Sequence, residues 1–203
     1  MKTVALVTEK GGAGKSTIAV NLAVAAHRQG KAVAVIDIDP QGSAVLWSKC
    51  RKDDGMAVLS ARANDLPRLL AEARKQGADL VVIDTAGREH LSADLAMENA
   101  DVVLVPTRAS MYDLAAGAST ADKVRSARTK HAAFVLNDLP PRGTRAGEAR
   151  AALAGLLPVA PVELHNLVAY SDALSAGLGV EEMEPNGKAA AEIQALYNWV
   201  ETL

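Results

Sequence analysis

The residues best suited to chemistry in this chain lie near its N-terminus, in the stretch EKGGAGKST, residues 9–17. The glycines at positions 11, 12 and 14 allow the backbone to curl so that successive N–H groups point inward and form a nest for an anion. Lys15 follows at the expected start of a helix, whose N-terminal end carries a partial positive charge. These residue types in this order predict a site that binds phosphate groups.

The same loop offers groups for a nucleotide and its metal ion. In the pattern G-x-x-x-x-G-K-[ST], the lysine follows the β- and γ-phosphates and the hydroxyl residue is a ligand of Mg²⁺. Lys15 and Ser16 occupy those two places, and Thr17 could reach the α-phosphate. Glu9 stands where the first glycine of the pattern would be, and a second lysine, Lys10, follows it. The spacing G-x-G-x-x-G is absent, which excludes a dinucleotide-binding loop of the Rossmann type. The residues expected at the nucleotide are Gly11, Gly12, Ala13, Gly14, Lys15, Ser16 and Thr17.

Strands and helices alternate along the chain and predict how this loop is positioned. Short runs rich in Val, Ile, Leu and Ala read as strands buried on both faces of a parallel sheet, at residues 2–8, 32–39, 56–61, 79–86, 101–107, 132–138 and 157–164. Helical patterns lie between them, at residues 14–30, 63–77, 92–100, 111–128, 144–156 and 187–203. The alternation predicts an α/β fold: a doubly wound, mostly parallel sheet with helices on both faces. We expect one domain over residues 1–203.

Acidic residues stand at the predicted ends of two strands, where ligands of such sheets bind. Asp37 and Asp39 close the strand of VAVIDID, and Asp84 follows four apolar residues in VVIDTAG. A carboxylate in the latter position holds Mg²⁺, often through water. The expected metal set is therefore Ser16, Asp37, Asp39 and Asp84.

Composition limits the remaining classes. About half of the residues are apolar, no apolar run has the length of a membrane span, and the N-terminus does not read as a signal peptide. Cys50 is the only cysteine, which excludes an intrachain disulfide and a paired-thiolate cluster. We expect a cytoplasmic protein that does not insert into a membrane.

Four motifs in this order resemble the ParA/MinD family of deviant Walker A P-loop ATPases. They are KGGAGKST, VIDIDPQGSAVLW, VVIDTAG and VLVPTRASMYDLAA, and residues 169–196 are similar to the closing segment of that family. The resemblance covers essentially the whole chain and is closest to short plasmid-partition ParA proteins. Two positions differ: TAGR follows Asp84 where many relatives have a Pro-Pro pair, and Leu167 stands where they commonly carry arginine.

The resemblance implies an ATPase that uses ATP and Mg²⁺ and turns over slowly until a partner stimulates it. It implies that Lys10 reaches across a homodimer to the nucleotide of the other subunit, that Lys15 acts within its own subunit, and that Asp39 orients the attacking water. Asn137 matches an adenine-contacting position, and the loop around Pro161 and Val162 is expected to cover the base.

The partners implied are non-specific DNA and a ParB-like or small DNA-binding adaptor, with association with the nucleoid. Residues 120–150 carry seven basic and three acidic residues, so the expected DNA contacts lie there. These candidates are Lys123, Arg125, Arg128, Lys130, Arg142, Arg145 and Arg150. Such an ATPase would segregate plasmid or chromosomal DNA, or position another cargo.

Two alternatives use no DNA. One is a scaffold that dimerises on ATP without turnover. The other is a MinD-like positioning ATPase, although the C-terminal tail AAEIQALYNWVETL, residues 190–203, has only acidic charges and would be repelled by an anionic bilayer.

Overall fold

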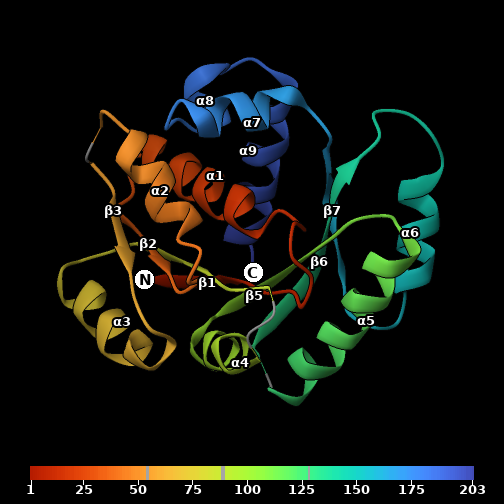
Figure 1. The fold of residues 1–203 in the computed structure, drawn as a ribbon, viewed down its shortest axis with the longest axis horizontal. Coiled ribbons are helices and arrows are strands. Elements are labelled where there is room, and N and C mark those ends of the chain that lie inside the picture. The colour runs from red at the N-terminus through yellow and green to blue at the C-terminus, as the bar shows by residue number, and fades with distance from the viewer. Residues whose placement is uncertain (54, 88–89, 128) are drawn as a thin grey trace.

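The fold is seen in a computed structural model that describes residues 1–53, 55–87, 90–127 and 129–203 (Figure 1). The strands are β1 (Lys2–Leu6), β2 (Val33–Asp37), β3 (Ala57–Ser60), β4 (Leu80–Asp84), β5 (Val102–Thr107), β6 (His131–Leu139) and β7 (Val159–His165). The longer helices are α1 (Lys15–Arg28), α3 (Leu66–Lys75), α4 (His90–Asn99), α5 (Met111–Ser126), α6 (Arg145–Leu153) and α9 (Lys188–Glu201). Shorter ones are α2 (Ser43–Cys50), α7 (Val168–Ser175), α8 (Val180–Met183) and the 3₁₀ turn η1 (Ala63–Asp65).

The strands form one seven-stranded sheet in the order β3-β2-β4-β1-β5-β6-β7. Every registered pair of strands in the described chain is parallel, as the buried apolar runs predicted. β1 lies in the middle, and the chain extends the sheet first to one side of it and later to the other. Ligands of open parallel sheets bind beyond the carboxyl ends of the strands at such a reversal. The loop of residues 9–14 leaves β1 at that place.

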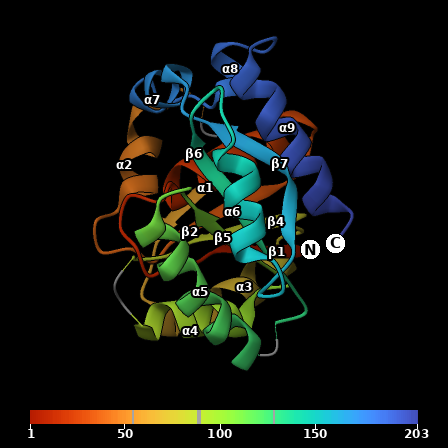
Figure 2. The same ribbon diagram turned by 90° about the vertical axis from the view of Figure 1, so that its right-hand side faces the viewer.

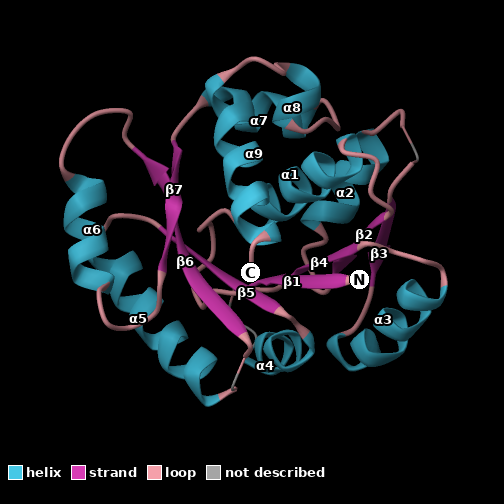
Figure 3. Ribbon diagram, turned by 180° about the vertical axis from the view of Figure 1, so that it is seen from behind, coloured by secondary structure: helices cyan, strands magenta, loops and turns pink. Residues whose placement is uncertain are grey.

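Helices cover both faces of the sheet. α1, α2, α7, α8 and α9 lie on one face and α3 to α6 on the other, as two opposite views show (Figures 1 and 3). The side chains of β1 alternate accordingly: Val4 and Leu6 join the first core, and Ala5 and Val7 join the second. The view from the side shows α5 and α6 packed along the β6–β7 end (Figure 2). The predicted architecture is therefore confirmed.

The sequence did not predict helix α2, because it buries only Ala44 and Trp47, too few residues for a clear period. Its end is tied to the segment between α7 and α8. Arg51 donates to Glu182 at 2.8 Å and lies over the Trp47 ring, 4.8 Å from its centroid. Trp47 Nε1 donates to the carbonyl of Leu178 at 3.1 Å. These contacts fix one wall of the cleft described below.

Asn21 joins the same C-terminal segment to α1. Its side chain donates to the Thr17 carbonyl at 2.8 Å and accepts from the buried N–H of Val180 at 2.8 Å. Among the described helices, none combines the length and apolar character needed to cross a bilayer.

We expect Asn21→Ala to lower the free energy of unfolding by about 1–3 kcal/mol, because it leaves the buried Val180 N–H without an acceptor. Urea unfolding followed by circular dichroism would measure the loss. Asn198→Ala, at an exposed position of α9, is the control and should stay within about 0.5 kcal/mol of the parent. Equal stability of both variants would contradict the assigned role.

Candidate nucleotide-binding site

The loop between β1 and α1 has the geometry of an anion site. Gly14 is the N-cap of α1 with φ 95°, and Gly12 has φ 75°, both in the left-handed region that glycine adopts without strain. No side chain of a described residue caps α1. The first N–H groups of the helix therefore remain available to an anion, and the helix dipole favours negative charge there.

Two close approaches hold the loop in this shape. Asn137, near the end of β6, donates its amide N–H to the Ala13 carbonyl at 2.8 Å. A Cβ on Gly14 would stand 2.1 Å from that amide nitrogen, so a larger residue would displace the Asn137 amide from the loop. On the other side Gly87, just after β4, packs so tightly that a Cβ there would lie 3.0 Å from the Gly11 nitrogen. Asn137 thus fixes the loop as well as facing the site.

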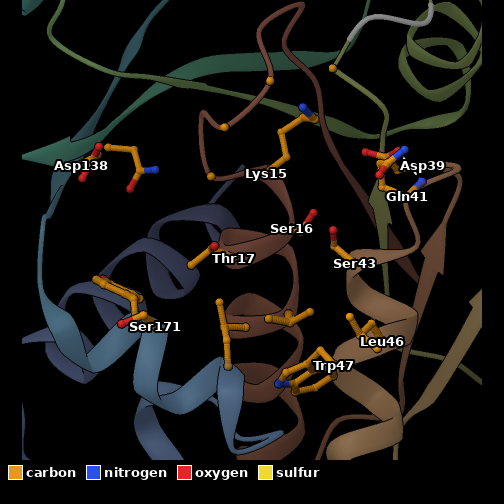
Figure 4. Close-up of a pocket in the computed structure, with 18 of the residues that line it drawn as sticks. Lys15, Ser16, Thr17, Asp39, Gln41, Ser43, Leu46, Trp47, Asp138 and Ser171 are labelled. Atoms are coloured by element: carbon orange, nitrogen blue, oxygen red, sulfur yellow. Dashed lines mark hydrogen bonds between the residues drawn. The ribbon is translucent and has the colours of Figure 1, made fainter.

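A cavity of about 1390 Å³ opens over the loop. Figure 4 shows Lys15, Ser16 and Thr17 at its centre, with Asp39 on one side and Asp138 on the other. Residues of α2 and α7 continue its wall, among them Leu46, Trp47 and Ser171. A space of this size at the end of a parallel sheet is large enough for a nucleotide.

Lys15 is a cation that the fold has largely removed from water, with 6% of its surface exposed. Burial lowers the pKa of its ammonium group, and the nearby charges of Asp84 and Asp39 act against that shift. An anion bound at the loop would add the negative charge that favours the protonated form. The site is therefore electrostatically prepared for phosphate.

Asp84 is the most unusual side chain of the site. It is fully buried, and neither carboxylate oxygen has a hydrogen-bond partner among the residues that the structure describes. Burial raises the pKa of Asp84 to about 7, against the opposing effect of the nearby Ser16 hydroxyl. Buried polar atoms without partners are rare, and a carboxylate of this kind needs a cation or a water to satisfy it.

Ser16 and Asp84 fit a Mg²⁺ ion, because a hydroxyl and a carboxylate are hard oxygen ligands and nucleotide phosphates and waters complete the usual octahedron. Over residues 1–53, 55–87, 90–127 and 129–203, no three His, Cys, Asp or Glu side chains converge on a metal position. The protein therefore offers few ligands of its own, as is usual for a metal that arrives with a nucleotide.

Asp37 corrects the predicted metal set. Its oxygens accept from the backbone N–H groups of Asp39 at 3.0 Å, Ala44 at 2.9 Å and Val45 at 3.1 Å. Asp37 is fully buried like Asp84, but both of its oxygens already accept hydrogen bonds from the backbone, whereas those of Asp84 have no partner in the described structure. It holds the start of α2 and the preceding loop, because orphan N–H groups at a helix N-terminus need an acceptor. Sequence spacing alone could not separate this role from metal binding.

Asp39 lies at the edge of the cavity. It lines the cavity, is partly exposed, and accepts from the N–H of Gln41 at 2.9 Å. This bond engages one carboxylate oxygen at the rim of the loop. The carboxylate is thus fixed in position and still open to the cavity.

Lys10 is held differently from Lys15. Its ammonium group is 2.8 Å from Asp113 at the start of α5, and 37% of the side chain is exposed. Burial alone would raise the pKa of Asp113, but hydrogen bonds from Lys10 and Ser110 hold it below its ordinary value. Glu9 pairs with Lys123 of the same helix, and its N–H donates to the Thr120 hydroxyl at 3.4 Å. The residue that replaces the first glycine of the pattern thus anchors the loop to α5.

The structure also corrects the expected cover for the base. Pro161 and Val162 lie inside strand β7 instead of a loop, and they are not among the described residues that line the cavity. The wall on that side is built by His165, Asn166 and Leu167, at the end of β7. The predicted strand at residues 157–164 already contained both residues, so the expectation of a loop there conflicted with it, and the structure has the strand.

Two polar residues of this wall were not predicted. Asp138 has φ 57°, uncommon for a residue other than glycine, and accepts from Asn166 at 2.6 Å. The guanidinium Nε of Arg108, after β5, lies 3.0 Å from the second Asp138 oxygen. The available signal in the sequence was that Asp138 ends the predicted strand at residues 132–138 and Arg108 follows the one at residues 101–107.

The predicted basic residues do not form one surface. Three of them pair with acids: Lys123 with Glu9, Arg125 with Asp122 and Arg150 with Glu163. Lys130 precedes β6 and lines a small cavity at the opposite edge of the sheet. Arg142 and Arg145 are exposed between β6 and α6, on the edge that carries the site. The prediction for Arg128 falls outside the described residues.

The fold and this loop define a P-loop nucleotide-binding protein. The family model for the CobQ/CobB/MinD/ParA nucleotide binding domain matches residues 4–180. Maintenance of carboxysome distribution protein A of Halothiobacillus neapolitanus is 32% identical over 213 residues, which cover 98% of this chain and 95% of that protein. The chain therefore belongs to the ParA/MinD family.

Solved structures agree on the fold. The septum site-determining protein MinD of Pyrococcus horikoshii, complexed with Mg-ADP, has a TM-score of 0.80 at 19% identity and covers 98% of this chain and 96% of its own. A McdA–ATP complex from Cyanothece has a TM-score of 0.78 at 16% identity, over 99% and 96% of the two chains. At these identities the likeness concerns the fold.

We expect Gly14→Ala to weaken nucleotide binding by at least about tenfold, because the added Cβ meets Asn137 and the loop must shift. Gly30→Ala is the matched control. Gly30 ends the same helix with φ 79°, and a Cβ added there would have no described atom within 4 Å. Both variants should lose about 1–2 kcal/mol of stability from backbone strain. Titration with a fluorescent nucleotide should separate them; equal affinities would show that the close approach is unimportant.

The pKa of Asp84 gives a pH dependence with a defined sign. The folded protein holds this proton up to about pH 7, whereas the unfolded chain releases it near the ordinary value of 3.8. The free energy of unfolding of nucleotide-free protein should therefore fall as pH rises from about 4 to 7, by at most about 4 kcal/mol from this group. The difference between wild type and Asp84→Asn, measured by urea unfolding across this range, isolates the effect. Parallel profiles would contradict it.

Proposed function

We propose that this chain is an ATPase that binds ATP with Mg²⁺, dimerises around the nucleotide and uses the ATP-bound dimer to position a cargo. The observation that carries the proposal is the different state of two lysines on one loop. Lys15 is buried close to Asp84 and Asp39, whereas Lys10 is partly exposed and held by one surface-facing ion pair. The first is placed for a phosphate in its own subunit and the second is free to change partner.

Different groups of the chain bind the phosphates, hold the metal ion and orient the attacking water. The N–H groups at the start of α1 and the Lys15 ammonium bind the β- and γ-phosphates, while Ser16 and Asp84 hold the metal ion. When bound, Mg²⁺ supplies positive charge to the phosphate oxygens during transfer. Asp39, fixed by the Gln41 N–H, orients the water that attacks the terminal phosphate.

Lys10 makes dimerisation depend on the triphosphate. In the proposed dimer it leaves Asp113 and binds the nucleotide of the other subunit, where it adds charge that a single P-loop lacks. Lys10 is the exposed partner of this pair, and the Ser110 side chain still contacts the Asp113 carboxylate when Lys10 leaves, so a phosphate can displace it. Hydrolysis breaks the bond between the β- and γ-phosphates. Release of the terminal phosphate then lets Lys10 return to Asp113, and the dimer separates.

The proposed cargo is a protein assembly or a DNA molecule. The similarity to a protein named for carboxysome distribution, over nearly the full length of both chains, supports positioning of an assembly. Non-specific DNA of the nucleoid is the proposed surface on which the dimer moves, with Arg142 and Arg145 as the best-placed contacts. A ParB-like or small DNA-binding adaptor would stimulate turnover. The ion pairs of three other candidates favour, as the alternative, a dimer that positions its cargo without DNA.

Co-sedimentation with DNA tests the proposal, in ATP, ADP or no nucleotide and across a salt series. Wild type should pellet with DNA only in ATP, and the log of affinity should fall with log salt by about 0.9 per phosphate contacted. Lys10→Ala should still bind ATP but should neither dimerise nor pellet. Lys75→Ala, an exposed lysine at the end of α3, is the control and should behave as wild type.

The possible outcomes distinguish the DNA-binding proposal from the alternative without DNA and test the role of Lys10. ATP-dependent dimers that never bind DNA would support the alternative without DNA. Normal dimers of Lys10→Ala would contradict the role of Lys10 between subunits. Failure of wild type to bind ATP would overturn the proposal as a whole.

A further inference from the structure

A buried carboxylate outside the phosphate site organises the far wall of the cavity. Glu192 of α9 is 8% exposed and accepts from the ring Nδ1 of His165 at 2.7 Å, from the His165 backbone N–H at 3.0 Å and from the Tyr170 hydroxyl at 3.2 Å. Lys188 stands 3.7 Å away at the surface. His165 ends β7, Tyr170 lies on α7, and both side chains belong to residues that line the cavity. Three elements thus meet at one carboxylate.

Glu192 fixes the hydrogen-bonding character of the His165 ring. An ionised carboxylate only accepts, so the shared proton resides on Nδ1. In the part of the chain that the structure describes, the other ring nitrogen, Nε2, has no hydrogen-bond partner. When the ring is neutral, a proton on Nδ1 leaves Nε2 as an acceptor for a donor from outside the protein. Its ring is 18% exposed, so a ligand in the cavity has access to it.

The position of His165 selects which part of a nucleotide it could meet. The phosphate loop follows β1, and the metal residue Asp84 and the water-orienting Asp39 lie on the side of β4 and β2. The cavity continues to the other side, over the ends of β5, β6 and β7, where Arg108, Asn137 and Asp138 line it and leave room for the nucleoside. Figure 4 shows this division, with Asp39 and Asp138 on opposite sides of Lys15. His165 lies at the end of β7, the strand farthest along that direction.

We propose that His165 reads the purine base, accepting a hydrogen bond at Nε2 from the 6-amino group of adenine. Guanine presents a carbonyl oxygen at that position, and two facing acceptors repel each other, so the same nitrogen rejects GTP. Glu192 is a positioning residue: it holds the imidazole in the accepting tautomer and does not touch the base. This inference rests on the proposed binding of ATP and names the residues that choose the base.

If Glu192 only stabilised the fold, it would not need the contact with the His165 imidazole. The backbone N–H of His165 and the Tyr170 hydroxyl already join β7 and α7 to Glu192. The imidazole adds a polarised group at the cavity wall, where an apolar side chain would pack against the base without distinguishing purines. Selectivity between purines therefore separates the two roles, because a structural tie would change the affinities for ATP and GTP together.

Isothermal titration of the full chain with Mg²⁺ and slowly hydrolysed analogues of ATP and GTP measures the selectivity. Tripolyphosphate with Mg²⁺ reports the phosphate site without a base. Wild type should prefer the ATP analogue by at least about tenfold, the effect of one hydrogen bond gained and one repulsion avoided. His165→Ala and Glu192→Gln should each bring the ratio close to one, and tripolyphosphate affinity should stay unchanged. Glu201→Gln, exposed on the same helix, is the control with wild-type behaviour.

Each result bears on a different statement. If wild type binds neither analogue nor tripolyphosphate, the proposed function fails before the base is considered. If wild type binds tripolyphosphate and the ATP analogue, but His165→Ala keeps the preference, the role of His165 is overturned. If Glu192→Gln keeps the preference while His165→Ala loses it, the positioning role of Glu192 is overturned. Thermal unfolding of each variant identifies any loss that comes from misfolding, and Glu192→Gln keeps the size of the side chain to limit it.

Discussion

The structure depends on the placement of opposite charges away from water where β1, β4 and α1 meet. Lys15 and Asp84 are both buried there, Asp84 completely and without a hydrogen-bond partner in the described chain. Isolated buried charges cost several kcal/mol each, and the raised pKa of Asp84 and the lowered pKa of Lys15 express that cost. The sheet and two layers of helices must hold this arrangement in place. Its natural complement is a polyanion that brings a divalent cation, which satisfies the amine and the carboxylate together.

Around this centre, side chains of the same type have different environments and different roles. Lys10 and Lys15 differ in burial because one precedes the glycine turn and the other begins the helix. Asp37 and Asp39 differ because the chain turns between them: the first faces the backbone of α2 and the second faces the cavity. Glu9 and Asp113 both bind a lysine across the gap between the loop and α5. The phosphate loop is therefore linked mechanically to α5, the helix that also contacts Lys10.

The far end of the cavity shows how a C-terminal helix can shape a site made by the N-terminal half. Glu192 belongs to α9, yet it sets the ring of His165 at the end of β7. Asn21 and Trp47 hold the segment before α9 against α1 and α2. The cavity thus has one side, at the glycine loop, that is fixed by a local turn and another side that is fixed by contacts between distant segments. These two sides are expected to respond differently to mutation.

The sequence alone was enough to predict the parallel sheet, the helices on both of its faces, the phosphate loop and the positions of Asp39 and Asp84 at strand ends. These features follow from local rules: apolar runs mark buried strands, glycine permits the turn, and parallel strands bring their ends to one edge. Other features depend on how the folded chain brings segments together. Asp37 caps α2, the residues at the end of β7 line the cavity in place of Pro161 and Val162, most of the basic residues are paired or far apart, and His165 meets Glu192. These outcomes depend on contacts between segments distant in sequence, and neither residue spacing nor periodicity records which side chains meet across such distances.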